Sequence, residues 1–348
     1  MTTLEIVLFM AFLVSNARTH NRSTIHKYKE KMNEYVNDEL QTFRKTRKPD
    51  IGGGRVLFFL YKKVNGKTVR SVESMHRSKK LHNGWLDCTL PLKVGFHGWQ
   101  QKMDTLFVKK MEEAYSNTAE RVQFVIVRWF GADQGYVAAK MSIPEAAKVI
   151  HMYLIRLTEE TQCIELKDIT LVGHSLGAQL AGAVGNRIRG DIGKIVALDP
   201  AYPLFWETAL DAVSRSSARW VVGVHTNPGY YGVDWNVGHV DFWANMGESP
   251  SASCIHPDKT QRGHHLFPPK GANIYFDYGD PLVLQLSCSH VMSIHLFFDS
   301  VRNPEKLMAQ ECDCTHTSHC EFRSGESLLS VFFNEMTSVP GQFCFFIS

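Results

Sequence analysis

The sequence of 348 residues has no long hydrophobic run, no strong excess of either charge, and no internal repeat or low-complexity tract. A membrane-spanning helix needs about 20 apolar residues, so none is expected. A formal net charge of +3 is too small to indicate a polyanionic partner. No nucleic-acid-binding motif is present, and we expect no nucleic-acid partner. The 44% hydrophobic content is sufficient for one large core or two smaller ones.

A short apolar run lies near the N-terminus. Ile6–Val14 (IVLFMAFLV) is too short to span a bilayer, and small residues follow at Ser15 and Ala17. This pattern predicts a secretory signal peptide, residues 1–17, although the usual Lys or Arg before the run is missing. We therefore expect a secreted, extracellular protein whose eight cysteines form disulfides. Asn21, in Asn-Arg-Ser, is then a candidate glycosylation site.

Residues 18–50 form a polar, basic segment. Between residues 26 and 48, apolar side chains at helical spacing predict a short amphipathic helix. The segment ends in a basic cluster, Arg44–Lys48, which makes it a candidate propeptide. A second basic cluster, Lys62–Lys80, could attract anionic lipid head groups. For both clusters we favour the simpler interpretation of a solvated surface.

Strand and helix patterns alternate after the glycines at 52–54. Strands are predicted at 56–61, 92–96, 122–127, 169–173 and 194–199, and helices at 144–160 and 176–189. The first helix has a capping box from Ser142 to Glu145, with Pro144 in its first turn. The alternation predicts an α/β domain over residues 51–348, with a mostly parallel sheet covered by helices on both faces.

The stretch from Leu171 to Gly182 reads LVGHSLGAQLAG. Glycines two residues before and two after Ser175, between a predicted strand and a predicted helix, are typical of an elbow that exposes a nucleophilic serine. Gly173 and Gly177 would let the helix pack close to the strand. An ordinary glycine-rich turn is the alternative.

Acyl transfer also needs two N–H donors for the oxyanion, an acid and a base. We expect one donor at Leu176, directly after the serine, and the other at Trp99, after the strand that ends at 96, with His97 a structural residue of that loop. Asp199 closes the strand at 194–199 and is the candidate acid, although an Asp-Pro turn is the alternative. Spacing alone does not choose the base among the downstream histidines, His225, His239, His264, His265, His290 and His295.

Several motifs follow one another in order: GHSLGAQLAG, LDPAYPLF (198–205), VHTN (224–227), GHVDFW (238–243) and CSH (288–290). From about residue 56 to 303, with a weaker match at 342–347, they resemble the animal secreted lipase family of pancreatic lipase, lipoprotein lipase and insect phospholipases A1. The resemblance implies an α/β-hydrolase fold, with Ser175 as nucleophile, Asp199 as acid and His290 as base. It also implies that Trp99 and Leu176 form the oxyanion hole.

The resemblance also implies a lid, at about 254–288, between bonded cysteines Cys254 and Cys288. Apolar side chains in this stretch could cover the site in water and open at a lipid surface, and a plain surface loop is the alternative. The chain leaves no room for the family's C-terminal β-sandwich, so we expect a single catalytic domain and no colipase. Contact with a membrane or lipid surface would be peripheral.

Two departures from the family pattern stand out. The segment 213–218 (VSRSSA) has no carboxylate where the family commonly binds calcium, so we expect no metal and no cofactor. Arg128 replaces the family's usual acid before a tryptophan. In the tail, Cys312, Cys314 and Cys320 with nearby histidines could suggest zinc, but disulfides are favoured in an exported chain. Partners for the remaining cysteines, Cys88, Cys163 and Cys344, are not evident.

The function expected from this reasoning is a secreted serine hydrolase that releases fatty acids from acylglycerols at a lipid–water interface. The long stretch between Cys254 and Cys288 favours a triacylglycerol lipase, because phospholipases A1 of the family tend to have short lids. The short connection from Thr226 to His239 favours phospholipase A1. A non-catalytic lipid-binding protein on the same fold is a further alternative, which an intact triad disfavours.

Overall fold

The computed structural model describes residues 30, 33–41, 54–64, 67–74, 85–117, 122–249, 254, 281–305, 307–315, 319–323, 330–332 and 339–347. The predicted signal peptide, Asn21, the basic cluster Arg44–Lys48 and the interior of the predicted lid lie outside these residues. No helix in the described ranges combines the length and apolar character that crossing a bilayer requires.

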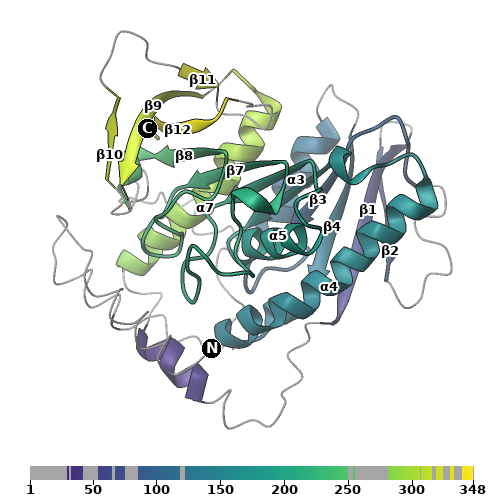
Figure 1. The fold of residues 1–348 in the computed structure, drawn as a ribbon, viewed down its shortest axis with the longest axis horizontal. Coiled ribbons are helices and arrows are strands. Elements are labelled where there is room, and N and C mark those ends of the chain that lie inside the picture. Colours follow the sequence, from purple (N-terminus) through teal and green to yellow (C-terminus); the bar gives the residue numbers. More distant parts are fainter. Residues whose placement is uncertain are drawn as a thin grey trace.

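Twelve strands of the described residues form one sheet, in the order β10-β9-β12-β8-β7-β6-β5-β3-β4-β1-β2, with β11 paired to β9 (Figure 1). The strands are β1 (Val56–Val64), β2 (Lys67–Glu73), β3 (Leu92–Phe96), β4 (Gln123–Trp129), β5 (Ile169–His174), β6 (Lys194–Leu198), β7 (Trp220–His225), β8 (Val240–Ala244), β9 (Met308–Thr315), β10 (His319–Phe322), β11 (Ser330–Phe332) and β12 (Gly341–Phe345). The helices are α3 (Leu106–Asn117), α4 (Tyr136–Thr161), α5 (Leu176–Arg187) and α7 (Pro281–Arg302), with short helices η1 (Phe130–Asp133), η2 (Leu166–Asp168), η3 (Arg215–Ser217) and η4 (Asn245–Gly247).

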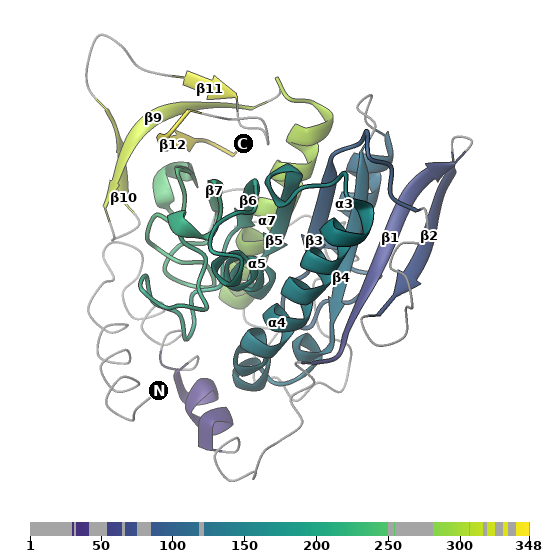
Figure 2. The same cartoon turned by 45° about the vertical axis from the view of Figure 1, so that its right-hand side comes forward.

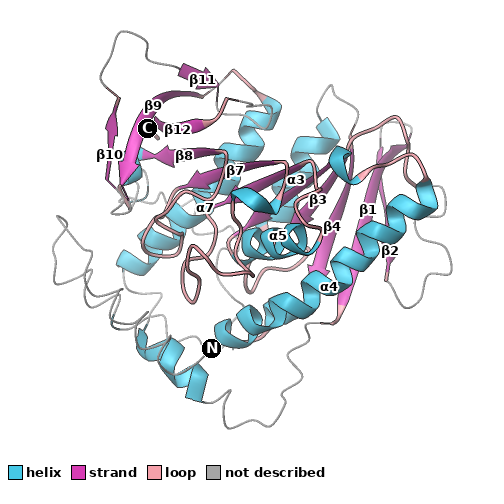
Figure 3. Cartoon of the chain, viewed as in Figure 1, coloured by secondary structure: helices cyan, strands magenta, loops and turns pink. Residues whose placement is uncertain are grey.

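The centre of the sheet is parallel. Strands β4, β3, β5, β6, β7, β8 and β12 pair in parallel, which confirms the predicted mostly parallel sheet. The edges are antiparallel: β1 and β2 lie at one end and β9, β10 and β11 at the other (Figure 3). Because parallel strands end at the same edge, the chain leaves β3, β5, β6 and β7 on one side, and the site is built there.

Helices cover both faces of the sheet, as predicted (Figure 2). On one face, Phe58 of β1 stacks on Tyr153 of α4, with ring centroids 3.6 Å apart, and α5 packs beside α4. On the other face, Phe107 of α3 meets Phe298 of α7 edge to face at 5.6 Å. The chain is thus a three-layer α/β fold, in which side chains of the strands alternate between two buried cores.

Helix α4 begins earlier than the sequence predicts. The predicted capping box at Ser142 is wrong, because the helix starts at Tyr136 and Pro144 lies inside it. The Ser142 hydroxyl donates to the carbonyl of Ala139 at 2.7 Å and packs against Gly131 so closely that a Cβ there would lie 1.9 Å from it. Tertiary packing of Ser142 thus overrides the local capping signal.

The amphipathic helix predicted in the N-terminal segment is present over residues 33–41. We call it the N-terminal helix; it is purple in Figure 1. Tyr35 and Val36 are buried in the same core as α4, and Leu40 packs against it. The N-terminal helix therefore packs into the core of the α/β domain.

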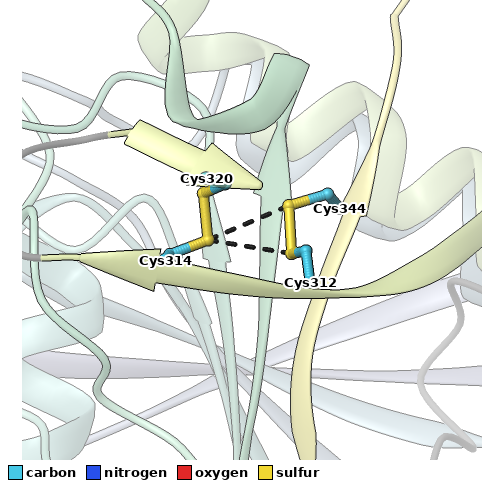
Figure 4. Close-up of side chains that lie close together, drawn as sticks. All are labelled: Cys312, Cys314, Cys320 and Cys344. Carbon is cyan, nitrogen blue, oxygen red and sulfur yellow. Dashed lines mark hydrogen bonds between the residues drawn. A yellow bond between two sulfur atoms is a disulfide. The ribbon is translucent and has the colours of Figure 1, made fainter. Parts of the chain in front are cut away.

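All eight cysteines are paired. The disulfides join Cys88 to Cys163, Cys254 to Cys288, Cys312 to Cys344 and Cys314 to Cys320. The last two lie side by side: the sulfur of Cys314 is 3.7 Å from that of Cys312 and 3.8 Å from that of Cys344 (Figure 4). Their sulfurs are close enough for a metal, but each is bonded to another sulfur, which confirms disulfides over zinc for these cysteines.

Candidate active site

Ser175 lies in a sharp turn between β5 and α5. Its backbone has φ 57° and ψ −125°, a conformation that costs on the order of 1–3 kcal/mol in a residue other than glycine. The two flanking glycines allow α5 to pass very close to the ends of β5 and β3. A Cβ on Gly173 would lie 2.4 Å from the carbonyl oxygen of Gly177, and a Cβ on Gly177 would lie 2.2 Å from that of Phe96. Helix α5 therefore presses its first turn against the ends of β5 and β3, with Ser175 at the apex.

Asp199 and His290 are in direct contact. Nδ1 of His290, in α7, lies 2.6 Å from Oδ2 of Asp199, which follows β6 and is fully buried. The backbone N–H groups of Thr226 and Asn227 donate to Oδ1 of Asp199 at 2.8 and 3.0 Å. Because a carboxylate accepts, Nδ1 of His290 carries a hydrogen, and in the neutral imidazole this leaves the lone pair on Nε2. A Cβ on Gly232 would lie 2.4 Å from Oδ1 of Asp199, so the chain closes tightly over this carboxylate.

His174 joins the elbow to the histidine in α7. Its ring centroid is 4.6 Å from that of His290, and its Nε2 lies 3.2 Å from the backbone oxygen of His290. Since a carbonyl only accepts, Nε2 is the donor. Burial, and then the neighbouring His290, lower the pKa of His174 well below its ordinary value. His174 is therefore neutral, and its hydrogen bond ties the backbone of α7 to the turn at Ser175.

The loop after β3 packs directly on Ser175. A Cβ on Gly98 would lie 3.1 Å from the Cβ of Ser175, and the N–H of Gly98 donates to Oε1 of Gln101 at 2.9 Å. The indole N–H of Trp99 donates to the carbonyl of Gln134 at 2.8 Å. Within the described residues, the backbone N–H groups of Trp99 and Leu176 have no hydrogen-bond partner. Both predicted oxyanion donors are thus available on the two segments that flank Ser175.

His97 stabilises the inside of this loop. Its ring is fully buried, and its Nδ1 lies 3.0 Å from the carbonyl of Gly98, to which it donates. Burial is the main reason that the pKa of His97 is lowered to about 4; the hydrogen bond to Gly98 opposes this shift and the nearby Arg128 adds to it by a smaller effect. The indole N–H of Trp129 donates to the carbonyl of His97 at 3.1 Å. These contacts agree with the structural role expected for His97.

Comparison with known proteins gives the family. A family model described as Lipase matches residues 20–329. The chain belongs to the Lipase family. Hepatic triacylglycerol lipase of Oryctolagus cuniculus is 28% identical over 270 residues, covering 74% of this chain and 51% of the relative. Phospholipase A1 member A of Bos taurus is 25% identical over 277 residues, covering 79% and 54%. Pancreatic lipase-related protein 2 of Cavia porcellus is 28% identical over 201 residues, covering 56% and 39%. The chain thus spans about half the length of the first two relatives.

In this Lipase family chain, a disulfide anchors both ends of the predicted lid. It joins the fully buried Cys254 to Cys288 in α7, two residues before His290. The residues between 254 and 281 lie outside the described part. The bond fixes where the stretch leaves and rejoins the domain, directly beside the histidine of the site.

Arg128, in place of the family's usual acid, has an acid partner elsewhere. Its guanidinium donates to a carboxylate oxygen of Asp133, five residues later, and to the carbonyl of Trp129 at 3.0 Å. It also lies over the ring of Phe130, 4.6 Å from the centroid. Arg128 is thereby buried with its charge paired, and it holds η1 against the end of β4.

The segment Val213–Ala218 does not fit a calcium ion. It offers no carboxylate, and its serine hydroxyl groups form hydrogen bonds with neighbouring residues. Ser214 and Ser217 form a capping box around η3, and the Ser217 hydroxyl donates to Oδ1 of Asn186 at 2.8 Å. These residues therefore supply hydrogen bonds that hold α5, and they lack the anionic oxygens that a hard cation needs.

The described part of the basic cluster Lys62–Lys80 lies far from the site. Strand β1 runs antiparallel to β4, so that Val56 pairs with Trp129 at the site edge. Lys63 and Lys67 therefore lie at the opposite edge of the sheet, where β1 turns into β2. A lipid surface held by Lys63 and Lys67 would therefore not face Ser175.

Three features of the site were not found from the sequence. His174 was overlooked, although it immediately precedes Ser175 within the pentapeptide. The backbone donors at Thr226 and Asn227 carry no sequence signal, because any residue has an N–H group. Asp133 could not be identified as the partner of Arg128, because this pairing depends on the path of the chain after β4.

Proposed function

We propose that this chain is a secreted hydrolase that releases fatty acid from lipid esters, through Ser175, His290 and Asp199. The contact of 2.6 Å between His290 and the buried carboxylate of Asp199, beside the strained turn at Ser175, is the observation that carries the proposal. Membership of the Lipase family supports it. An orienting acid, a histidine whose Nδ1 faces that acid, and a serine held in a strained turn between strand and helix are the parts that acyl transfer requires.

In the first half of the reaction, Nε2 of His290 takes the proton of the Ser175 hydroxyl as its oxygen attacks the ester carbonyl. Asp199 keeps the hydrogen on Nδ1 and stabilises the imidazolium that forms. The imidazolium then gives its proton to the leaving alcohol as the ester C–O bond breaks. An acyl-enzyme remains. In the second half, His290 takes a proton from water, the hydroxide attacks the acyl carbonyl, and Ser175 recovers its proton as the fatty acid leaves.

The oxyanion that forms in each half needs preorganised donors. The backbone N–H groups of Trp99 and Leu176 are the proposed pair, because no described residue accepts a hydrogen bond from them and they lie on the segments that flank Ser175. Leu176 is the first residue of α5, where N–H groups have no acceptor within the helix and the helix dipole favours negative charge. Removing one such donor typically costs about 10²–10³-fold in kcat.

Acylglycerols are the proposed substrates. The length of the stretch between Cys254 and Cys288, 34 residues apart, supports a lid of the triacylglycerol lipase type. Phospholipase A1 is the second candidate. The connection from Thr226 to His239, between β7 and β8, favours it because this connection is short.

Fatty-acid release tests this proposal on both lipids. Wild-type, Ser175→Ala and Ser216→Ala proteins are assayed on triolein emulsion and on phosphatidylcholine vesicles; Ser216 is an exposed serine of η3 and serves as the control. We expect release by wild type and Ser216→Ala, faster from triolein, and none by Ser175→Ala. Faster release from the vesicles makes phospholipase A1 the better assignment. No release from either lipid by wild type contradicts the proposal and favours a lipid-binding protein.

Secretion has a separate test. The short apolar N-terminal run and the pairing of all eight cysteines support it. We expect protein collected from the culture medium to begin at Arg18, or after Arg47 if the basic segment is also removed. Protein that stays inside the cell and begins at Met1 contradicts secretion.

A further inference from the structure

Helix α4 has no capping side chain of its own. Its N-cap residue is Gly135, and its first turn contains no acid. Two side chains of the N-terminal helix supply the missing contacts. The N–H of Val137 donates to Oε2 of Glu39 at 2.8 Å, and the N–H of Tyr136 donates to the hydroxyl of Tyr35 at 3.5 Å. The first N–H groups of a helix need such partners, and a negative charge there is favourable.

The contact is closely fitted. Oε1 of Glu39 accepts a hydrogen bond of 2.6 Å from the hydroxyl of Tyr35. A Cβ on Gly135 would lie 2.1 Å from the same oxygen, so only glycine leaves room for this carboxylate. Burial of Tyr35 and Val36 in the main core holds the N-terminal helix in place. In Figures 1 and 2 this helix lies beside one end of α4.

The turn that Glu39 fixes also holds Trp99. The indole N–H of Trp99 donates to the carbonyl of Gln134, and its ring meets that of Tyr136 edge to face, with centroids 5.3 Å apart. The ring of Tyr35 lies 6.5 Å from that of Trp99. The N-terminal helix, the turn at 134–136 and Trp99 therefore form a continuous packed chain that ends beside Ser175.

We propose that the N-terminal helix is a positioning element of the active site, with Glu39 as the positioning residue. Glu39 touches no substrate; it fixes the start of α4, and through that turn the backbone N–H of Trp99. The inference rests on the proposed function, because Trp99 is the proposed oxyanion donor. One consequence concerns cleavage at Arg44–Lys48. If the chain is cut there, residues 33–41 must stay bound for full activity.

The test compares Glu39→Gln with Asp38→Asn in the full chain. Both variants replace a carboxylate with an amide, and Asp38 is exposed on the same helix. Turnover is measured on a soluble ester, p-nitrophenyl butyrate, well below the melting temperature. For Glu39→Gln we expect kcat to fall roughly tenfold with KM little changed, since a small misplacement of a catalytic group has large effects. Asp38→Asn should match wild type, and Glu39→Asp should recover part of the loss.

Backbone hydrogen exchange at Tyr136 and Val137 gives a readout that does not depend on turnover. Exchange should accelerate in Glu39→Gln and stay unchanged in Asp38→Asn. Faster exchange with unchanged kcat would mean a merely structural cap and would overturn the inference. Unchanged exchange would overturn it as well. An inactive wild type would instead be a failure of the proposed function, which separates the two ideas.

Discussion

Acidification should destabilise the folded chain through His97, a histidine that the fold keeps neutral. Nδ1–H donates to the carbonyl of Gly98 at 3.0 Å, and Nε2 is buried without a partner within the described residues. A second proton would have to enter a site that water does not reach. Burial therefore lowers the pKa of His97 from 6.5 to about 4.

The sign and size of the effect follow from this pKa. Between pH 6.5 and pH 4 the unfolded chain binds a proton at His97 that the folded chain does not, so the free energy of unfolding rises with pH. The contribution is fully present above pH 6.5 and is lost as the pH falls toward 4. Because one pKa unit corresponds to about 1.4 kcal/mol, a pKa moved from 6.5 to about 4 makes this contribution about 3 kcal/mol.

Denaturant unfolding of wild type, His97→Asn and His97→Gln at pH 7 and at about pH 4.5 measures this contribution. The pKa of His174 is also lowered by burial, but His174 titrates in all three proteins and cancels in the comparison. We expect both variants to lose about 2 kcal/mol less stability than wild type between the two pH values, because this interval covers only part of the titration between pKa values of about 4 and 6.5. Agreement between two replacements of different shape shows that the lost titrating group, and not altered packing, is the cause. Equal pH dependence in all three proteins would refute the reasoning.

Three further results are expected. Asp199→Asn should lower kcat by about 10⁴-fold in the ester assay, because an amide can no longer fix the hydrogen on Nδ1 of His290; a variant that keeps a tenth of the activity would contradict this role. Gly177→Ala should lower the free energy of unfolding by roughly 1–3 kcal/mol and reduce turnover, since its Cβ would lie 2.2 Å from a backbone oxygen at the end of β3. An unchanged free energy of unfolding would contradict this, because it would show that the turn accommodates the added methyl group. Paired Cys254→Ser and Cys288→Ser replacements should lower the free energy of unfolding by roughly 4 kcal/mol, the value expected for a closed loop of this length, and a loss under 1 kcal/mol in denaturant titration would contradict it.

The central elements of the fold could be predicted from the sequence because their signals are local. Strands β3, β5 and β6 are short apolar runs bounded by turn residues, and the structure places them close to the predicted limits. The start of α4 could not be predicted, because packing of Ser142 against Gly131 decides it. Strands β10 to β12 are short; β12 pairs with the distant β8, and disulfides join β9 to β10 and to β12, so local sequence carries little signal for this edge.

The site was predictable to different degrees. The elbow around Ser175 has a local motif, whereas His290 could be chosen among several histidines only through the resemblance to a family. The structure brings His290 and Asp199 into contact, a pairing across 91 residues that no local pattern encodes. The docking of Glu39 on α4 was also out of reach, because it depends on a space left by a glycine in another segment.

Labelling with a fluorophosphonate probe, followed by peptide mapping, tests the central claim most directly. Such a probe reacts with a serine only when a neighbouring base activates it. We expect a single adduct on Ser175 in the folded protein, none in Ser175→Ala, and strongly slowed labelling in His290→Ala. Absence of an adduct on Ser175 in the folded wild type, or labelling that persists at full rate without His290, would contradict the assignment of the nucleophile and its base.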